Sequence, residues 1–185
     1  GNAVVYSFTP EITASLAGSV EKTYDGTAVA SLSSANFAVE GLLDGDTVTI
    51  ASATSFYLGA GTGVGDGPSA RDVGTGKTVT SDVSIVDGVQ RVYGYQLTNS
   101  TATAVIGAIT PAPLTISASI DSKLYDATTS SAFAPTLTSG SLGTGDTLLG
   151  LSQVFESKNV LGSGGSTLAV SGYTINDGNA GNNYS

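Results

Sequence analysis

Apolar and polar residues alternate in short segments along most of the chain. In the clearest segment, residues 114–120, one face carries Leu114, Ile116, Ala118 and Ile120, and the other carries Thr115, Ser117 and Ser119. A period of two residues is typical of a β-strand that turns one face towards a core. The same alternation occurs at residues 47–50, 93–97 and 173–176, and none of these segments shows the helical period.

Turn signals separate the predicted strands at intervals of roughly ten residues. They are Asp25-Gly26, Asp44-Gly45-Asp46, Asp87-Gly88, Ser139-Gly140 and Asp177-Gly178. Short strands with regular turns predict an all-β chain built from immunoglobulin-like β-sandwiches. A β-helix is the alternative, but its rungs recur at roughly twenty residues, and no such period occurs in this sequence.

The chain contains two copies of one sequence pattern. The stretch Lys22-Thr23-Tyr24-Asp25-Gly26-Thr27 returns as Lys123-Leu124-Tyr125-Asp126-Ala127-Thr128. Other matches follow in the same order: Gly45-Asp46-Thr47-Val48 with Gly145-Asp146-Thr147-Leu148, Asp72-Val73 with Asn159-Val160, Thr78-Val79 with Thr167-Leu168, and Tyr95 with Tyr184. This ordered set predicts two tandem repeats in an extended arrangement.

The ends of the repeats follow from a further match between residues 3–10 and residues 104–111. We therefore expect residues 1–8 to be the last strand of a preceding repeat and residues 9–110 to be the first repeat. Residues 111–185 would then be a second repeat that lacks its final strand. Such a repeat could accept residues 3–8 of another molecule as an added strand.

The first repeat carries a glycine-rich insertion at about residues 55–69. Glycine at alternate positions resists packing, so the insertion is expected to be a surface loop. Loops often carry binding residues, and Phe56, Tyr57 and Asp66 are the candidates for contacting a ligand there.

The net charge of −9 with six basic residues excludes several classes of partner. So few cations leave no basic surface for nucleic acid or anionic lipid. No run of eighteen apolar residues is present, so we expect no membrane insertion. The sequence has no histidine and no cysteine, and we predict no catalytic site and no enzyme activity.

Two further motifs contain residue types found in ligand sites. Asp44, Asp46 and Asp146 are candidates for calcium because carboxylate oxygens suit that ion, but aspartate in a turn usually binds its own backbone. No cofactor is therefore expected. The stretch Gly74–Thr78 ends like a phosphate-binding loop, yet Arg71 stands where the first glycine of that pattern belongs and a strand-like segment follows.

The Tyr-Asp-Gly motif itself is interpreted as structural. Tyr24 and Tyr125 are expected to anchor the core, and Asp25 and Asp126 to form turns. Ala127 stands where the first copy has Gly26, which suggests that this position does not require a positive φ. Lys22 and Lys123 are expected to be flanking surface charges; an isopeptide crosslink from these lysines is an alternative that would need a buried lysine beside a carboxyl group.

Several motifs carry a family resemblance: residues 22–27, 42–48, 72–79, 109–116 and 181–184. They resemble the YDG and MBG-like repeats of filamentous-haemagglutinin-type bacterial adhesins, which are exported by two-partner secretion. The resemblance implies an extracellular stalk of tandem β-sandwiches whose partners are neighbouring repeats and whose task is to project a binding region from the cell. Two alternatives stay open. Loops of the first repeat could bind a host glycan or surface protein, or the repeats could mate with like repeats on neighbouring cells.

Overall fold

The computed structural model describes residues 8–43, 45–59, 68–86 and 94–185. Helix is limited there to a short 3-10 turn, η1 (Ser34–Asn36), and a single α-helical turn, α1 (Pro68–Arg71), and the other elements are strands. The prediction of an all-β chain is therefore confirmed. No helix in the described part is long and apolar enough to cross a membrane.

The chain divides into two compact units. Unit 1 contains residues 1–22 and 28–109, and unit 2 contains residues 23–27 and 110–185. The segment that carries Tyr24 therefore belongs to unit 2, although its sequence lies within the first repeat.

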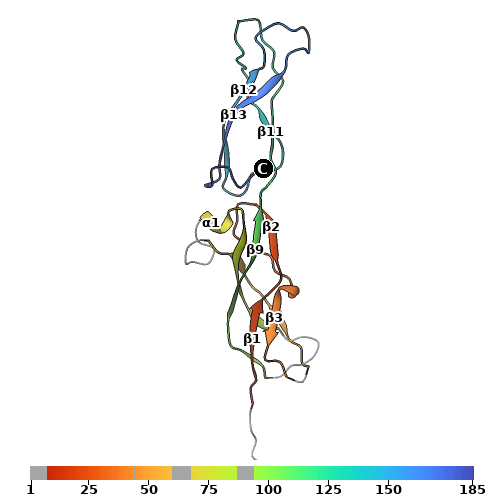
Figure 1. The fold of residues 1–185 in the computed structure, drawn as a ribbon, viewed down its shortest axis with the longest axis vertical. Helices are drawn as coiled ribbons and strands as arrows, with labels where there is room; N and C mark the ends of the chain where they lie inside the picture. The colour runs from red at the N-terminus through yellow and green to blue at the C-terminus, as the bar shows by residue number, and fades with distance from the viewer. Residues whose placement is uncertain (1–7, 44, 60–67, 87–93) are drawn as a thin grey trace, which may run out of the picture. The chain divides into compact units, whose positions relative to one another are not determined.

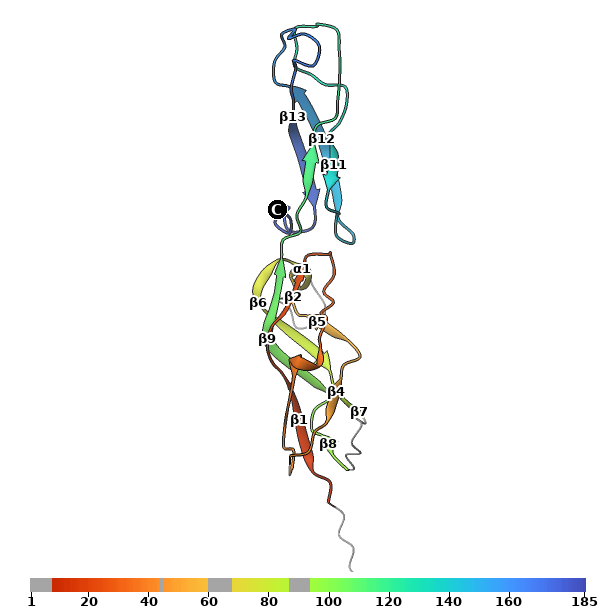
Figure 2. The ribbon, with the colours of Figure 1, turned by 90° about the vertical axis from the view of Figure 1, so that its right-hand side faces the viewer.

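Three sheets are found among the described residues of the first repeat (Figures 1 and 2). The first sheet has the strand order β3 (Phe37–Glu40), β1 (Glu11–Leu16), β8 (Gln96–Leu97). The second has the order β2 (Val20–Thr23), β9 (Thr101–Thr110), β6 (Gly74–Asp82), β5 (Ser55–Tyr57). The third consists of β4 (Thr49–Ala51) and β7 (Ser84–Val86). Strand β1 shows how sequence sets this packing, because Ile12, Ala14 and Leu16 are buried and the residues between them are exposed.

Tyr57 of β5 lies at the centre of the unit 1 core and is 0% exposed. Its hydroxyl donates to the carbonyl oxygens of Val20 at 3.1 Å and Ala108 at 3.3 Å. Strand β9 passes directly over the ring: a Cβ atom added to Gly107 would lie 2.7 Å from Tyr57 Cε1 and 2.9 Å from Val79 Cγ2. Glycine at position 107 is thus what lets β9 cover this core.

Unit 2 contains two strand pairs, β10 (Thr115–Ser117) with β11 (Thr136–Ser139), and β12 (Thr147–Phe155) with β13 (Leu168–Asn176). Figures 1 and 2 both show β12 and β13 side by side. Its buried residues include Pro135 and Phe155 but also three polar side chains, Gln153, Asp177 and Asn183.

Strand β10 is shorter than the alternation in residues 114–120 predicts. It ends at Ser117, and Ile120, expected to face the core, is 95% exposed. The reason is the buried Gln153 side chain, which accepts from the Ser119 backbone N–H at 2.7 Å and donates to the Ser119 carbonyl at 2.8 Å. Both backbone groups of Ser119 are thereby taken up by a side chain.

The two repeats share a backbone framework around β5 and the end of β12. Tyr57 N–H donates to the Ala28 carbonyl at 2.8 Å, and Phe155 N–H donates to the Thr129 carbonyl at 2.9 Å. Residues 55–57, which we expected within the insertion, therefore form a strand with a counterpart in the second repeat. The residues that lack a counterpart come after Tyr57, and residues 60–67 lie outside the described part.

The stretch that ends like a phosphate-binding loop lies within β6 and precedes no helix. Lys77 donates instead to the carbonyl oxygens of Ser69 and Asp72, both at 2.8 Å. Burial lowers the pKa of Lys77, against the opposing effect of the Asp72 charge. This lysine therefore fastens the segment around α1 to the sheet.

Candidate functional site

Three side chains that the sequence separates widely meet in unit 2, and we call them the tyrosine–aspartate cluster: Tyr24, Asp146 and Tyr184. The hydroxyls of Tyr24 and Tyr184 both donate to Asp146 Oδ2, at 2.8 Å and 2.5 Å. The two rings meet edge to face with 5.3 Å between their centroids and 79° between their planes. One carboxylate oxygen therefore holds two aromatic side chains.

Backbone contacts hold residues 23–27 beside the cluster. Tyr24 N–H donates to the Thr110 carbonyl, and Thr144 N–H donates to the Asp25 carbonyl, each at 2.8 Å. The Asp25 carboxylate caps its own turn, because Oδ1 accepts from the Thr27 N–H at 2.8 Å and the Thr27 hydroxyl at 2.9 Å. The side chain of Asp25 thus orders the two residues that follow it.

Two glycines let the backbones of residues 25–26 and 143–144 approach each other. Gly26 has a φ of 81°, and a Cβ atom added to it would lie 2.3 Å from the Thr144 nitrogen. A Cβ atom added to Gly143 would lie 2.8 Å from the Gly26 nitrogen and 2.9 Å from Tyr24 Cε1. Side chains at positions 26 and 143 would therefore force these segments apart.

A buried turn next to Tyr184 positions its ring. Asp177 is 1% exposed, and its carboxylate accepts backbone N–H groups of Asn179 at 2.8 Å, Gly181 at 2.9 Å and Asn183 at 3.3 Å. Burial alone would raise the pKa of Asp177, but these three donors leave it below its ordinary value. The polar run 176–183 thus uses its aspartate to order the backbone.

The cluster changes the acidity of Tyr184. Burial first, and then the hydrogen bond to Asp146, raise the pKa of Tyr184 to about 12, although the Gly143 N–H that donates to its hydroxyl at 2.7 Å acts in the opposite direction. Tyr184 therefore stays protonated over the physiological range of pH and can donate its hydrogen bond to Asp146 throughout.

Unit 1 contains the same Tyr–Asp pair. The Tyr95 hydroxyl donates to Asp46 Oδ2 at 2.9 Å and accepts from the Leu43 N–H at 2.9 Å, as Tyr184 does with Asp146 and Gly143. Asp46 and Asp146, two of the three calcium candidates, thus each accept a hydrogen bond from a tyrosine hydroxyl. The described residues contain no group of three or more His, Cys, Asp or Glu that could hold a metal ion, and Asp44 lies outside them.

The second copy of the motif repeats the local turn. Asp126 Oδ1 accepts from the Thr128 N–H and the Thr128 hydroxyl, both at 2.9 Å, and lies 2.9 Å from Lys123 Nζ. Ala127 has a φ of 65°, so the expectation that this position does not require a positive φ is wrong. The Asp–Thr hydrogen bonds impose that φ on either residue type.

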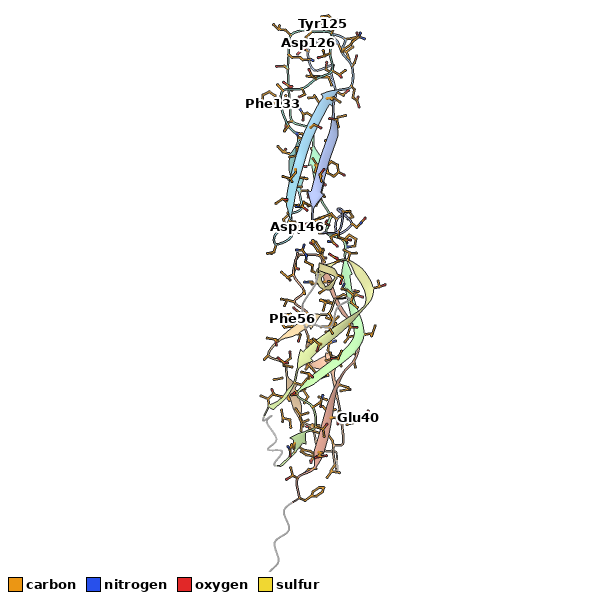
Figure 3. All side chains as sticks on the ribbon, turned by 90° about the vertical axis from the view of Figure 1, so that its left-hand side faces the viewer. Glu40, Phe56, Tyr125, Asp126, Phe133 and Asp146 are labelled. Atoms are coloured by element: carbon orange, nitrogen blue, oxygen red, sulfur yellow. The ribbon has the colours of Figure 1, made fainter. Side chains whose placement is uncertain are left out.

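The two copies differ in what surrounds the tyrosine. Tyr24 is 4% exposed, whereas Tyr125 is 62% exposed and so is not the core anchor that its position in the repeat predicted. Figure 3 shows Tyr125 and Asp126 at one end of unit 2 and Asp146 at the other end.

The lysines of the two copies are more than flanking charges. Lys22 Nζ lies 5.7 Å from the centroid of the Tyr57 ring, and Lys123 Nζ lies 5.5 Å from that of Phe155. Cation–π contacts of this kind add favourable energy to each repeat. They also explain why a lysine recurs two residues before each tyrosine.

The fold gives different surroundings to Phe56 and Tyr57, two of the residues expected to contact a ligand. Tyr57 is a core residue, Phe56 is half-buried in β5 and pairs with Val29, and Asp66 lies outside the described residues. Sequence reasoning singled out Tyr24, Asp146 and Tyr184 individually but missed that they meet. The available signal was that Gly-Asp and the late tyrosine recur together in both repeats.

Comparison with known proteins gives one family. No curated protein and no solved structure matches the chain. The YDG domain family matches residues 110–185, which are the residues of unit 2 apart from the segment that carries Tyr24. The chain therefore contains a YDG domain at residues 110–185.

Proposed function

We propose that the two repeats are structural spacers in the stalk of a secreted, filamentous-haemagglutinin-type bacterial surface adhesin, each folded as an immunoglobulin-like sandwich. The observation that carries this proposal is the incorporation of residues 23–27 into unit 2. A segment of the first repeat is thereby bound to the second by backbone hydrogen bonds and by the Tyr24–Asp146 contact. Neighbouring repeats are the partners that this arrangement serves.

The strands suit a spacer because an extended strand gives a large length per residue. A strand rises by about 3.3 Å per residue, so the nine residues of β12 or β13 span roughly 30 Å. The tyrosine–aspartate cluster adds side-chain hydrogen bonds to the backbone contacts of residues 23–27, and the YDG family match to residues 110–185 is consistent with a repeated module. The low share of charged residues, 11%, leaves few groups for binding charged ligands.

The first test measures how far the repeats extend from the cell surface. One or more tandem copies of this chain would be placed between a cell anchor and a terminal fluorophore on a bacterial surface. A spacer predicts that the height of the fluorophore above the membrane increases with each copy. A height that does not change with copy number would contradict the proposal.

Binding is the second measurement. The purified chain would be applied to host cells and to a glycan array, beside a variant whose residues 60–67 are replaced by a short glycine linker that leaves β5 intact. A spacer predicts no saturable binding by either protein. Saturable binding that is lost in the linker variant would overturn the spacer role in favour of a ligand-binding adhesin module.

A further inference from the structure

Among the described residues, unit 2 has no strand at the place that β9, the last strand of the first repeat, takes beside β6. Strand β9 lies between β2 and β6, pairs antiparallel with β6, and covers Tyr57 and Val79 through Gly107. Strand β6 therefore has partners on both edges, β5 on one and β9 on the other.

Hydrogen bonds identify the equivalent residues in unit 2. Leu58 N–H donates to the Thr78 carbonyl at 2.9 Å, and Glu156 N–H donates to the Thr167 carbonyl at 3.0 Å. This correspondence places Phe155 at the position of Tyr57. It places Leu168, the first residue of β13, at the position of Val79.

A groove of about 620 Å³ lies where β9 would pass. Its lining includes Phe155, Leu168, residues 120–123 and residues 157–164. Among the described residues, β13 pairs with β12 alone, so the edge that corresponds to the β9 side of β6 has no strand beside it. The groove is also bordered by the exposed apolar side chains of Val160 and Leu161.

We propose that this groove binds one extended strand with the sequence pattern of β9, paired antiparallel with the start of β13. Transferring the β6–β9 register places the Ala104 position of the bound strand opposite Leu168 and the Gly107 position opposite Ser166, above Phe155. Recognition would combine main-chain hydrogen bonds along an open edge with apolar contact to the groove floor. The bound strand needs a glycine at the position that faces Phe155, because the Phe155 ring takes the space that a side chain would need there.

The glycine requirement decides between two strands of this chain. Residues 3–8 match residues 104–109 in sequence, but Tyr6 stands at the position of Gly107. A side chain at that position would meet the Phe155 ring, as a Cβ atom on Gly107 would meet Tyr57. The occupant is therefore a strand of the β9 type, and the inference does not depend on the spacer role.

A labelled peptide with the sequence of residues 101–110 is the probe. We expect saturable binding to the whole chain, together with slower amide hydrogen exchange at residues 167–171. The matched control is the same peptide with Gly107→Val, which is expected to bind at least about tenfold more weakly. Equal binding of both peptides, or binding without protection of β13, would overturn the proposal.

A chain with the sequence of residues 97–111 appended after Ser185 tests whether a covalently attached strand fills the same groove. The extended chain should have a higher unfolding midpoint for unit 2 and should no longer bind the peptide. The same extension with Gly107→Val should leave the midpoint unchanged and the peptide binding intact. Self-association of the original chain that disappears when residues 1–9 are removed, without any peptide binding, would show that residues 3–8 are the occupant and would overturn the proposal.

Discussion

The turns at Tyr24 and Tyr125 have the same local hydrogen bonds and opposite surroundings. In each turn an aspartate accepts from the backbone and the hydroxyl of the threonine two residues later, and the intervening residue has a positive φ. Tyr24 is buried against Asp146 and Tyr184, whereas Tyr125 is exposed. The turn is therefore encoded by its own few residues, and the role of the tyrosine is decided by what lies opposite.

The glycine of the motif separates these two contributions. A positive φ alone does not demand glycine, because Ala127 adopts it. The close approach of the Thr144 backbone to Gly26 does demand it. Comparing substitutions at the two turns should therefore separate the effect of backbone conformation from the effect of contact.

The largest contrast is expected from Gly26→Ala and Ala127→Gly. The first places a Cβ atom against the Thr144 backbone and should lower the free energy of unfolding of unit 2 by about 2–4 kcal/mol. Ala127→Gly removes strain at a positive φ but increases the backbone entropy that is lost on folding. These two effects oppose each other, so the free energy of unfolding of unit 2 should change by less than about 1 kcal/mol. Native-state hydrogen exchange of unit 2 amides during urea titration measures both, and similar effects of the two substitutions would refute the contact argument.

Removing the tyrosine hydroxyls gives the next contrast. Tyr24→Phe deletes a hydrogen bond to a carboxylate and should cost about 1–3 kcal/mol. Tyr125→Phe alters an exposed side chain and should stay within about 0.5 kcal/mol. Thermal unfolding followed by near-ultraviolet circular dichroism compares the two variants. An equal loss in both would mean that Tyr125 has a partner of equal strength.

The raised pKa of Tyr184, about 12, predicts a loss of stability at high pH. The folded state binds this proton more tightly than the unfolded state, in which tyrosine has a pKa of about 10. The stabilisation is therefore complete below about pH 10 and disappears as the pH rises towards 12. Tyrosinate absorbance and urea midpoints over this range measure it, with Tyr184→Phe as the control, and an unchanged pH dependence in that variant would contradict the assignment.

The smallest effect is expected at Asp126. The hydrogen bond from Lys123, followed by those from Thr128, lowers the pKa of Asp126 to about 2. Any stabilisation from this carboxylate is present above the ordinary aspartate pKa and is lost as the pH falls towards 2. Lys123→Gln should move the Asp126 titration, followed by carbon-13 NMR, back towards the ordinary value. A titration that stays where it was would show that Thr128 alone is responsible.

Part of the fold could be predicted from local sequence, since alternation placed β4 with the buried Ile50 and the last four residues of β13. It failed at Ile120 because the Gln153 side chain, distant in sequence, binds the backbone of Ser119. The repeat matches identified Asp146 and Tyr184 as a recurring pair. Their shared contact with Tyr24 could not be predicted, because sequence periodicity carries no information on which distant side chains meet.

The two glycines that face each other at positions 26 and 143 have a consequence for how such a gene can evolve. The equivalent positions are Ala127 in the other turn and Leu43 in the other loop. Recombination that placed a copy of the first repeat after the second would bring an alanine turn towards a leucine loop, where the observed contact has a glycine on each side. If these repeats belong to a longer array, the steric fit at positions 26 and 143 would then limit which repeats can stand next to each other.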